Sequence, residues 1–488
     1  MHKQHTHGLA FVRSVRPLVV VLLAVLILSS GCSRTEGTRG GSTKPAAFYV
    51  APTGNDSNKG TLVAPFLTLE RARDAMRASS TTKTVFLRAG SYARTTTLVL
   101  TSADDGETWQ YYPPEGVDTA ILDGGAHASH TGVDVLLIQG ASNITIDGLQ
   151  IQNSDNYGIG IHGGAPFEDQ FAGPVPPASG DAIVNNVIHD GYTWHTQRWA
   201  GGGVWFEGQV KNLVVRNNVV YNQYGSAIRG CANPDGDTPT DDLSGLDIED
   251  NAIYDVDTIV KDNGAIYTED RTGKKSTHLT IKNNYVRDWS RDAPEDRGIY
   301  LDDGTSNATV TGNVVGPPGK AARGTASLLI SSGSNNTVSG NIFDLGTSGK
   351  DSLMIHYNMP GSRNAMTNNT FQGNVVIMSF AGRQSTEFFA PGVSYQADVG
   401  SGAAQPASPN CRNNVYHNYA GGQERTDGNR FGDRAPIHTD PQLSGWAYSV
   451  TPGSPILKAP VNFQGGEGCW GPPGFKIPQT GTPPSCPH

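Results

Sequence analysis

Two segments of the chain place carboxylates at matching positions behind an aromatic residue. One reads GAIYTED and ends at Asp270, and the other reads GIYLDDG and contains Asp302 and Asp303. Glu269 and Asp302 are then equivalent. If the two segments are neighbouring strands, about 4.8 Å apart, their carboxyl groups lie roughly 5 Å from each other. Retaining glycosidases use an acid and a nucleophile at that separation, and like charges this close raise one of the two pKa values.

These segments belong to a series of short strands that can be laid over one another. Because side chains two residues apart point the same way, the strands form columns. One outward column comprises Gly160, Trp205, Arg229, Tyr267, Tyr300, Leu329 and Met354. The acid column, two residues further along each strand, comprises His162, Glu207, Cys231, Glu269, Asp302, Ser331 and His356. The inward column comprises Ile159, Val204, Ile228, Ile266, Ile299, Leu328 and Leu353.

The columns suggest which residues bind and which react. Trp205, Tyr267 and Tyr300 would offer flat faces to sugar rings. The other expected substrate contacts are His162, Glu207 and Arg229, and the catalytic candidates are Glu269, Asp302, Asp303, Asp270 and Asp262. Glu207 lies two strands from Glu269, roughly 10 Å away, which is nearer the separation of inverting enzymes.

An Asn-centred repeat must position these strands. It surrounds Asn218, Asn251, Asn284, Asn313, Asn341 and Asn369. Neighbouring Asn residues of this series are 28 to 33 residues apart. A motif that recurs at such an interval, flanked by β-branched residues and Gly/Asn turns, is the signature of stacked repeats. It predicts an all-β fold, a right-handed parallel β-helix with one coil per repeat.

The recurrent Asn has a physical explanation. Bends between strands need left-handed backbone torsions, which Gly and Asn tolerate best, as at Gly148 and Asn217. Asn side chains stacked coil over coil can also hydrogen-bond as a ladder in the interior.

The two ends of the repeat region carry different patterns. Residues 69–77 form an amphipathic pattern that predicts a short helix capping the first coil. Residues 164–180 and 232–242 are Pro/Gly/Asp-rich loop insertions, and residues 440–463 form a closing segment. We expect one domain with caps.

The composition excludes some partners. The formal net charge is −9 and no stripe of Lys or Arg appears, which argues against nucleic acid. Cys231, Cys411, Cys469 and Cys486 lack the spacing of a metal cluster, so we expect no metal. Cys469 and Cys486 bracket the C-terminal tail and are the best candidates for a disulfide.

The N-terminal segment predicts export. A basic start precedes an apolar run of about a dozen residues that ends in LSSGC at Cys32. This sequence resembles a bacterial lipoprotein signal, which implies lipidation at Cys32 and a membrane anchor. We therefore expect a signal peptide at 1–31, a tether at 32–46, a β-helix at 47–465 and a tail at 466–488. The protein would be a monomer in the cell envelope, or secreted.

Taken together, the opening segment FYVAPTGNDSNKGTLVAPFLTLERARDAMR, the motifs DNGAIYTED and GIYLDDGTSNATVTGNVV, and the ending SPILKAPVNF resemble β-helix proteins of the pectin-lyase-like superfamily. Within it they resemble the glycoside hydrolases of families 120 and 141, which include β-xylosidases and α-fucosidases. The resemblance implies a poly- or oligosaccharide substrate, no cofactor, and a carboxylate pair on the parallel-sheet face.

Two other functions fit the same fold. A polysaccharide lyase would need a basic catalytic residue, and Ca²⁺ to neutralise a uronate carboxylate. Arg229, Lys261, Arg271 and Arg297 lie near the expected face, but no lysine falls in the outward columns. A non-catalytic surface protein that binds glycan is the third reading, although clustered acids and aromatics argue against a pure spacer.

Overall fold

The computed structural model divides the chain into two units, Met1–Lys44 and Pro45–His488, and only the second is described. The expected signal peptide, tether, lipidation site at Cys32 and tail, with Cys469 and Cys486, lie outside the described residues. The structure describes 47–112, 119–125, 134–164, 174–192, 201–232, 240–260, 262–272, 276–290, 296–319, 325–347, 352–358, 366–379, 393–396, 410–421, 433–444 and 448–458.

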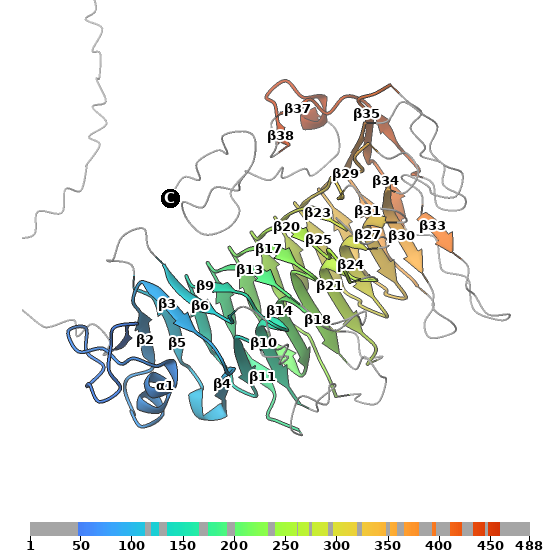
Figure 1. The fold of residues 1–488 in the computed structure, drawn as a ribbon. Helices are drawn as coiled ribbons and strands as arrows, with labels where there is room; N and C mark the ends of the chain where they lie inside the picture. Colours follow the sequence, from blue (N-terminus) through green and yellow to red (C-terminus); the bar gives the residue numbers. More distant parts are fainter. Residues whose placement is uncertain are drawn as a thin grey trace, which may run out of the picture. The chain divides into compact units, whose positions relative to one another are not determined.

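The described coils of the second unit build three parallel sheets, which we call sheets I, II and III in chain order, and the central coils contribute one strand to each. Figure 1 shows successive coils side by side, coloured from blue to orange. Sheet I contains β1 (Phe48–Val50), β2 (Thr84–Leu87), β5 (Thr108–Tyr111), β8 (Thr145–Asp147), β12 (Ala182–Val184), β16 (Val214–Arg216), β19 (Asp247–Glu249), β22 (Leu279–Lys282), β25 (Ala308–Thr311), β28 (Thr337–Ser339), β31 (Thr370–Gln372) and β34 (Asn410–Arg412).

Sheets II and III complete the coils. Sheet II contains β3 (Gly90–Ala93), β6 (Ala120–Asp123), β9 (Gln150–Gln152), β13 (Val187–Gly191), β17 (Val219–Gln223), β20 (Ala252–Val256), β23 (Tyr285–Trp289), β26 (Val314–Val315), β29 (Ile342–Asp344), β32 (Val375–Met378), β35 (Val415–Asn418) and β36 (Ile437–His438). Sheet III contains β4 (Leu98–Thr101), β7 (Leu136–Gln139), β10 (Tyr157–Gly163), β14 (Gly202–Gly208), β18 (Ile228–Ala232), β21 (Gly264–Asp270), β24 (Arg297–Asp302), β27 (Thr325–Ser331), β30 (Ser352–Asn358) and β33 (Val393–Gln396). The expected right-handed parallel β-helix is confirmed.

The remaining elements lie outside these three sheets. Two short strands pair in parallel, β11 (Ala178–Ser179) and β15 (Val210–Lys211). The strands β37 (Leu443–Ser444) and β38 (Ser449–Val450) pair antiparallel. The 3₁₀ turns are η1 (Ser102–Asp104) and η3 (Pro455–Lys458).

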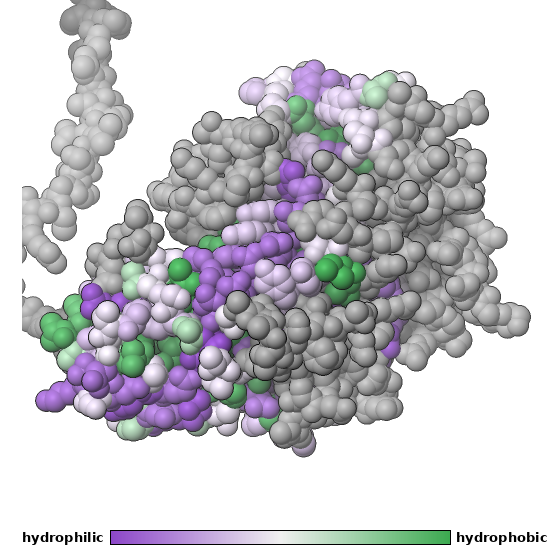
Figure 2. Space-filling view, in the orientation of Figure 1, coloured by the Kyte–Doolittle hydropathy of each residue, from purple (hydrophilic) through white to green (hydrophobic). Residues whose placement is uncertain are grey.

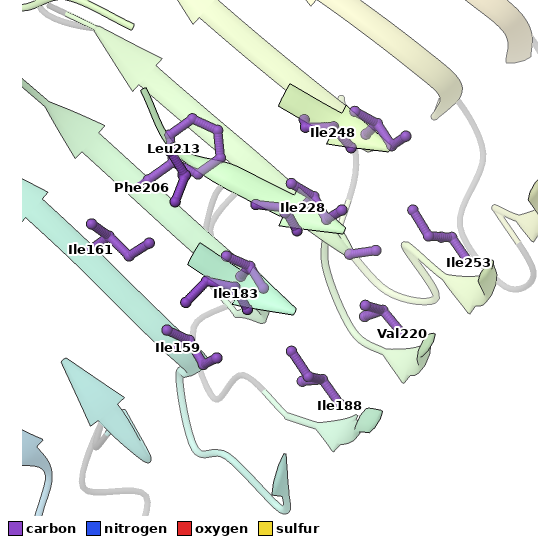
Figure 3. Packing of buried hydrophobic residues seen from close by; sticks show 14 of the residues in the cluster. Ile159, Ile161, Ile183, Ile188, Phe206, Leu213, Val220, Ile228, Ile248 and Ile253 are labelled. Atoms are coloured by element: carbon purple, nitrogen blue, oxygen red, sulfur yellow. The ribbon is translucent and has the colours of Figure 1, made fainter. Parts of the chain in front are cut away.

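Aliphatic side chains from all three sheets fill the interior of the coils. In one coil Ile159 of β10 faces Ile183 of β12 and Ile188 of β13, and the same arrangement recurs in the next coils (Figure 3). Each such side chain contributes roughly 1.5–3 kcal/mol when it is fully buried. The expected inward column is confirmed from Ile159 to Leu328.

The expected register fails at the last coil of that column. Leu328 pairs with Ile355, and Leu353 pairs with Ala326 instead. His356 therefore lies opposite Leu329 and not opposite Ser331. The alignment of the strand sequences alone does not detect this offset.

A helix covers the first coil, as expected from residues 69–77. This helix, α1 (Leu69–Arg77), begins where the Thr68 side chain accepts a hydrogen bond from the Arg71 backbone N–H at 3.2 Å. Leu69, Ala72 and Met76 point into the same core as the strands. In the expected closing segment, Ile456 and Tyr448 do not enter the core inside the coils. They belong to a second hydrophobic cluster, on the outer face of sheet II, which includes Ile342.

Few large hydrophobic side chains are exposed among the described residues, and Val63 is the most exposed of them. In the view of Figure 2 hydrophobic residues form small separate spots among hydrophilic ones. Among the described residues, no helix is long and apolar enough to cross a membrane.

A ladder of buried Asn side chains runs along the bend between sheets I and II. The backbone N–H of Asn218 donates to Oδ1 of Asn251 at 2.9 Å, and that of Asn251 donates to Oδ1 of Asn284 at 3.0 Å. The Asn251 side-chain amide donates to the Val215 carbonyl at 2.9 Å. Asn251 therefore hydrogen-bonds to the coil before it and to the coil after it. The ladder contains Asn186, Asn218, Asn251, Asn284, Asn313, Asn341, Asn374 and Asn414.

The backbone torsions of the bend explain why an Asn, Asp or Gly residue precedes each ladder Asn. The residue before each ladder Asn has a positive φ, for example 55° at Asn217 and 67° at Gly312. Gly148, with a φ of 70°, occupies the equivalent place before Leu149, whose backbone N–H donates to the first ladder residue, Asn186. The expectation for Asn369 is wrong, since Asn374 follows Asn341 in the ladder. Asn369 accepts from the Asn336 backbone N–H in a second row, at the bend before β31.

We predict that Asn251→Ala lowers the free energy of unfolding by roughly 2–4 kcal/mol, because it leaves the Asn218 N–H and the Val215 carbonyl buried without partners. Asn217→Gly, which keeps the positive φ at the neighbouring position, should change it by less than about 0.5 kcal/mol. Urea denaturation followed by circular dichroism measures both. Equal effects in the two variants would show that the ladder does not stabilise the coils.

Candidate active site

The outer face of sheet III carries the acid column in the expected register. His162 pairs with Glu207, Glu207 with Cys231, Cys231 with Glu269, and Glu269 with Asp302. All five side chains are buried. Parallel strands without bulges place these residues on one line, so Glu269 and Asp302 come from adjacent coils and Glu207 lies two coils from Glu269.

A tyrosine hydroxyl joins the two central carboxylates. Tyr267 Oη lies 3.0 Å from Glu269 Oε2 and 2.7 Å from Asp302 Oδ2. The two carboxylate oxygens are therefore no further apart than the sum of these distances. That limit agrees with the roughly 5–5.5 Å between the carboxyl groups of retaining glycosidases.

Burial gives both carboxyl groups unusual proton affinities. Glu269 is 3% exposed, and burial together with the nearby Asp302 raises its pKa to about 7. Asp302 is 9% exposed, and burial with the adjacent Asp303 raises its pKa to about 6. Hydrogen bonds from Tyr267 and from the Asp303 backbone N–H, at 2.8 Å, oppose the rise at Asp302 because they stabilise its ionised form.

An arginine lies at the more exposed end of the pair. Nε of Arg271 lies 2.7 Å from Glu269 Oε1, and its Nη2 contacts Asp303. The side chains of Arg271 and Asp303 are 29% and 14% exposed. The guanidinium thus links two acids from adjacent coils and lowers the pKa of Glu269 against the effect of burial.

Two of the five expected catalytic residues, Asp270 and Asp262, hold their hydrogen-bond or ion-pair partners outside the pair, although the charge of Asp262 also raises the pKa of Asp302. Oδ1 of Asp270 accepts from Thr272, and its Oδ2 accepts from the Ser276 backbone N–H and hydroxyl at 3.0 and 2.6 Å. This carboxylate therefore organises the turn after β21. Asp262 precedes β21, has a φ of 61°, and lies 3.5 Å from Arg297 Nη1.

The aromatic column is packed rather than open. Trp205 is only 1% exposed, and the Arg229 guanidinium lies 4.7 Å from its ring centroid and 4.4 Å from that of Tyr267. Tyr300 packs edge-on against Tyr267 at 5.1 Å. The expectation that Trp205, Tyr267 and Tyr300 present exposed flat faces is wrong, because cation–π and ring contacts between coils occupy those faces.

Arg229 is a buried structural cation in this arrangement. It donates to Asn263 Oδ1 at 2.5 Å, and it lies in register between Trp205 and Tyr267. These contacts fix the Tyr267 ring, so that its hydroxyl stays between the two carboxyl groups.

Glu207 and His162 form a separate buried group. His162 Nδ1 lies 3.1 Å from Glu207 Oε1, and Trp205 Nε1 donates to Glu207 Oε2 at 3.2 Å. Cys231, a free buried thiol, occupies the coil between this group and the pair. Its Sγ lies 3.8 Å from Glu269 Oε2.

Sequence reasoning missed several polar residues next to these groups. Asp134 accepts from Asn156 and from the Tyr157 backbone N–H, and burial raises its pKa to about 7. A Cβ at Gly160 would lie 2.9 Å from its carboxylate, so this glycine in the outward column makes room for Asp134. A glycine in a column of large side chains was the feature of the sequence that could have indicated a buried neighbour at this position. Asp257 and Asp296 are also wholly buried, in the bends that precede β21 and β24.

No group of three His, Cys, Asp or Glu side chains within the described ranges could hold a metal ion. Lys261, one of the basic residues near the expected face, lies outside the described residues.

Comparisons with known proteins concern the fold. Residues 131–343 match the family model described as right handed beta helix region. A GH136 lacto-N-biosidase from Eubacterium ramulus is 14% identical over 80% of this chain and 67% of its own, with a TM-score of 0.48. The mannuronan C-5 epimerase AlgE6 A-module from Azotobacter vinelandii is 14% identical over 76% and 94%, with a TM-score of 0.45.

A rhamnogalacturonan lyase is 13% identical over 80% of this chain and 87% of its own, with a TM-score of 0.42. A search of curated proteins gives no match. The sheet topology and the match over residues 131–343 show that this chain has a right-handed parallel β-helix fold.

Proposed function

We propose that this protein is a carbohydrate-active enzyme, a glycoside hydrolase whose carboxylate pair is Glu269 and Asp302. The observation that carries the proposal is the shared contact with Tyr267, at 3.0 and 2.7 Å, which limits the separation of the two carboxyl groups. At that separation no water fits between a carboxylate and the sugar, so the reaction proceeds through a covalent glycosyl intermediate with retention of configuration.

The surroundings of the two carboxyl groups favour different roles. Asp302 accepts two hydrogen bonds that stabilise its charge, from Tyr267 and the Asp303 backbone, and is the nucleophile. Glu269 is more deeply buried and holds its proton to higher pH, which suits a general acid and then a general base. A glycan would approach from the more exposed side, where Arg271 and Asp303 lie.

The reaction needs no cofactor in this proposal. The lyase alternative invokes Ca²⁺ held by the acid cluster, and the described acids fit it poorly. Asp270 is saturated by Thr272 and Ser276, and Asp303 is paired with Arg271. A lyase would also need a base on this face, where the described basic side chains are arginines that remain charged and His162, which is fully buried against Glu207.

We further propose that the enzyme is exported as a monomer and is anchored through a lipid on Cys32. The support is the basic start, the short apolar run and the LSSGC sequence. A site in the cell envelope would give the enzyme direct access to extracellular or periplasmic glycans.

Glu269→Gln and Asp302→Asn should each lower kcat on the order of 10²–10⁴-fold on a responsive substrate. The assay screens the purified mature protein on aryl-glycosides and polysaccharides, and records reducing ends and ultraviolet absorbance together. Glu249→Gln is the matched control, because Glu249 pairs with Arg216 on sheet I, away from the pair.

New reducing ends that disappear only in the two site variants support the hydrolase. Absorbance at the wavelength of an unsaturated uronate would instead indicate a lyase. Full activity in both site variants would place the chemistry elsewhere.

The activity should have a bell-shaped pH profile with a narrow maximum between about 6 and about 7. Below that window Asp302 is protonated and cannot attack, and above it Glu269 has lost the proton it must donate. The two apparent pKa values that the limbs of this profile report describe the coupled pair and not either residue alone. A profile that stays flat from pH 5 to pH 9, measured as kcat/KM, would contradict these roles.

Cys32→Ala should move the protein from the membrane fraction to the soluble fraction of expressing bacteria, because the lipid attaches to that thiol. Immunoblots of the two fractions measure the change. Ser30→Ala, two residues earlier, is the control and should leave the protein in the membrane fraction.

A further inference from the structure

The Tyr267 hydroxyl contacts both carboxylates of the pair. Tyr267 stands in the middle of β21, and its hydroxyl reaches Glu269 on its own strand and Asp302 on β24. A phenol has one proton to donate, whereas two carboxylate oxygens lie within hydrogen-bond distance.

Two distributions of a single proton satisfy both contacts, one with Glu269 protonated and one with Asp302 protonated, and the two distances favour the first. If both carboxyl groups were ionised, one of the two short contacts would join a lone pair to a negative oxygen. When Glu269 is protonated, its Oε2–H donates to Tyr267 Oη, and the Tyr267 O–H donates to Asp302. The shorter distance, 2.7 Å, is the one to Asp302, as expected for a bond to a charged acceptor.

The phenol is held in place and stays protonated. Arg229 covers one face of the ring at 4.4 Å and Tyr300 packs against it edge-on. Burial, followed by the charges of Asp302 and Glu269, raises the pKa of Tyr267 well above its usual value. The charged or titratable groups that surround the pair and the phenol are Arg229, Cys231, Asp262, Arg271, Tyr300 and Asp303.

We propose that the Tyr267 hydroxyl follows the negative charge of the catalytic pair, donating to Asp302 in the free enzyme and to Glu269 in the glycosyl intermediate. This inference rests on the proposed hydrolase for its catalytic role, while the hydrogen-bond exchange itself is a property of the protein alone. Tyr267 is a positioning residue here, not a sugar-binding platform.

The two steps balance without transfer of the phenol proton. In the first, Asp302 attacks the anomeric carbon, the glycosidic C–O bond breaks, and Glu269 gives its proton to the leaving oxygen. The negative charge moves from Asp302 to Glu269, and the Tyr267 O–H rotates toward Oε2. In the second, water attacks the anomeric carbon and gives a proton to Glu269. Asp302 then leaves as a carboxylate and the O–H rotates back.

The first test needs no substrate. Side-chain carboxyl groups labelled with ¹³C are titrated by NMR in the wild type and in Tyr267→Phe, with assignments from Glu269→Gln and Asp302→Asn. We expect the Asp302 titration to move to higher pH, because its charged form loses a donor. The Glu269 titration should move to lower pH, because its protonated form loses an acceptor.

Tyr254→Phe is the matched control, since the Tyr254 hydroxyl on sheet II is buried without a hydrogen-bond partner. It should leave both titrations unchanged. Asp302→Asn gives an independent reading that keeps Tyr267 intact. There the phenol turns to Glu269, and the Glu269 titration should fall further in this variant than in Asp302→Asn/Tyr267→Phe.

The proposal would be overturned if the pKa values of Asp302 and Glu269 are unchanged in Tyr267→Phe, or if both change in the same direction. In the activity assay Tyr267→Phe should lower kcat on the order of 10²-fold with KM unchanged, and shift the acidic limb of the pH profile to higher pH. A wild type that is inactive on every glycan would refute the hydrolase while the NMR result still decides the hydrogen-bond exchange.

Discussion

Backbone hydrogen bonding between successive coils is the constraint on which the rest of this structure depends. Parallel pairing without bulges holds equivalent residues of neighbouring coils about 4.8 Å apart. The same spacing brings Ile266 onto Ile299 in the core and Glu269 onto Asp302 outside it. The Asn ladder fixes each coil against its neighbours at the bend, so the register cannot slip without leaving buried amides unpaired.

The outer face of sheet III shows what this spacing can achieve electrostatically. Two carboxyl groups on adjacent coils are buried together, and burial raises the pKa of both. Such a pair costs stability unless donors and cations surround it. Tyr267, Arg271 and the Asp303 backbone supply those partners, and each acts more strongly on one carboxyl than on the other. The asymmetry separates an acid from a nucleophile.

Burial also changes the role that the aromatic column can have. A stripe of Trp and Tyr beside acids in a sequence suggests an open sugar-binding surface. In the folded protein Arg229 inserts between Trp205 and Tyr267, and the rings become part of the packing. Their polar atoms then serve the carboxylates, as Trp205 serves Glu207 and Tyr267 serves the central pair.

The sequence by itself determined the coil fold, the capping helix α1 and the register of the acid column from His162 to Asp302, because alternation and repeat period follow from local strand geometry. Tertiary structure alone decided that Asn374 and not Asn369 continues the ladder, since the length of a loop sets which bend a residue reaches. It also decided that Asp270 serves a turn and Tyr267 bridges the pair. Side-chain direction, burial and hydrogen-bond partners depend on neighbouring coils about 30 residues away, and no local pattern records them.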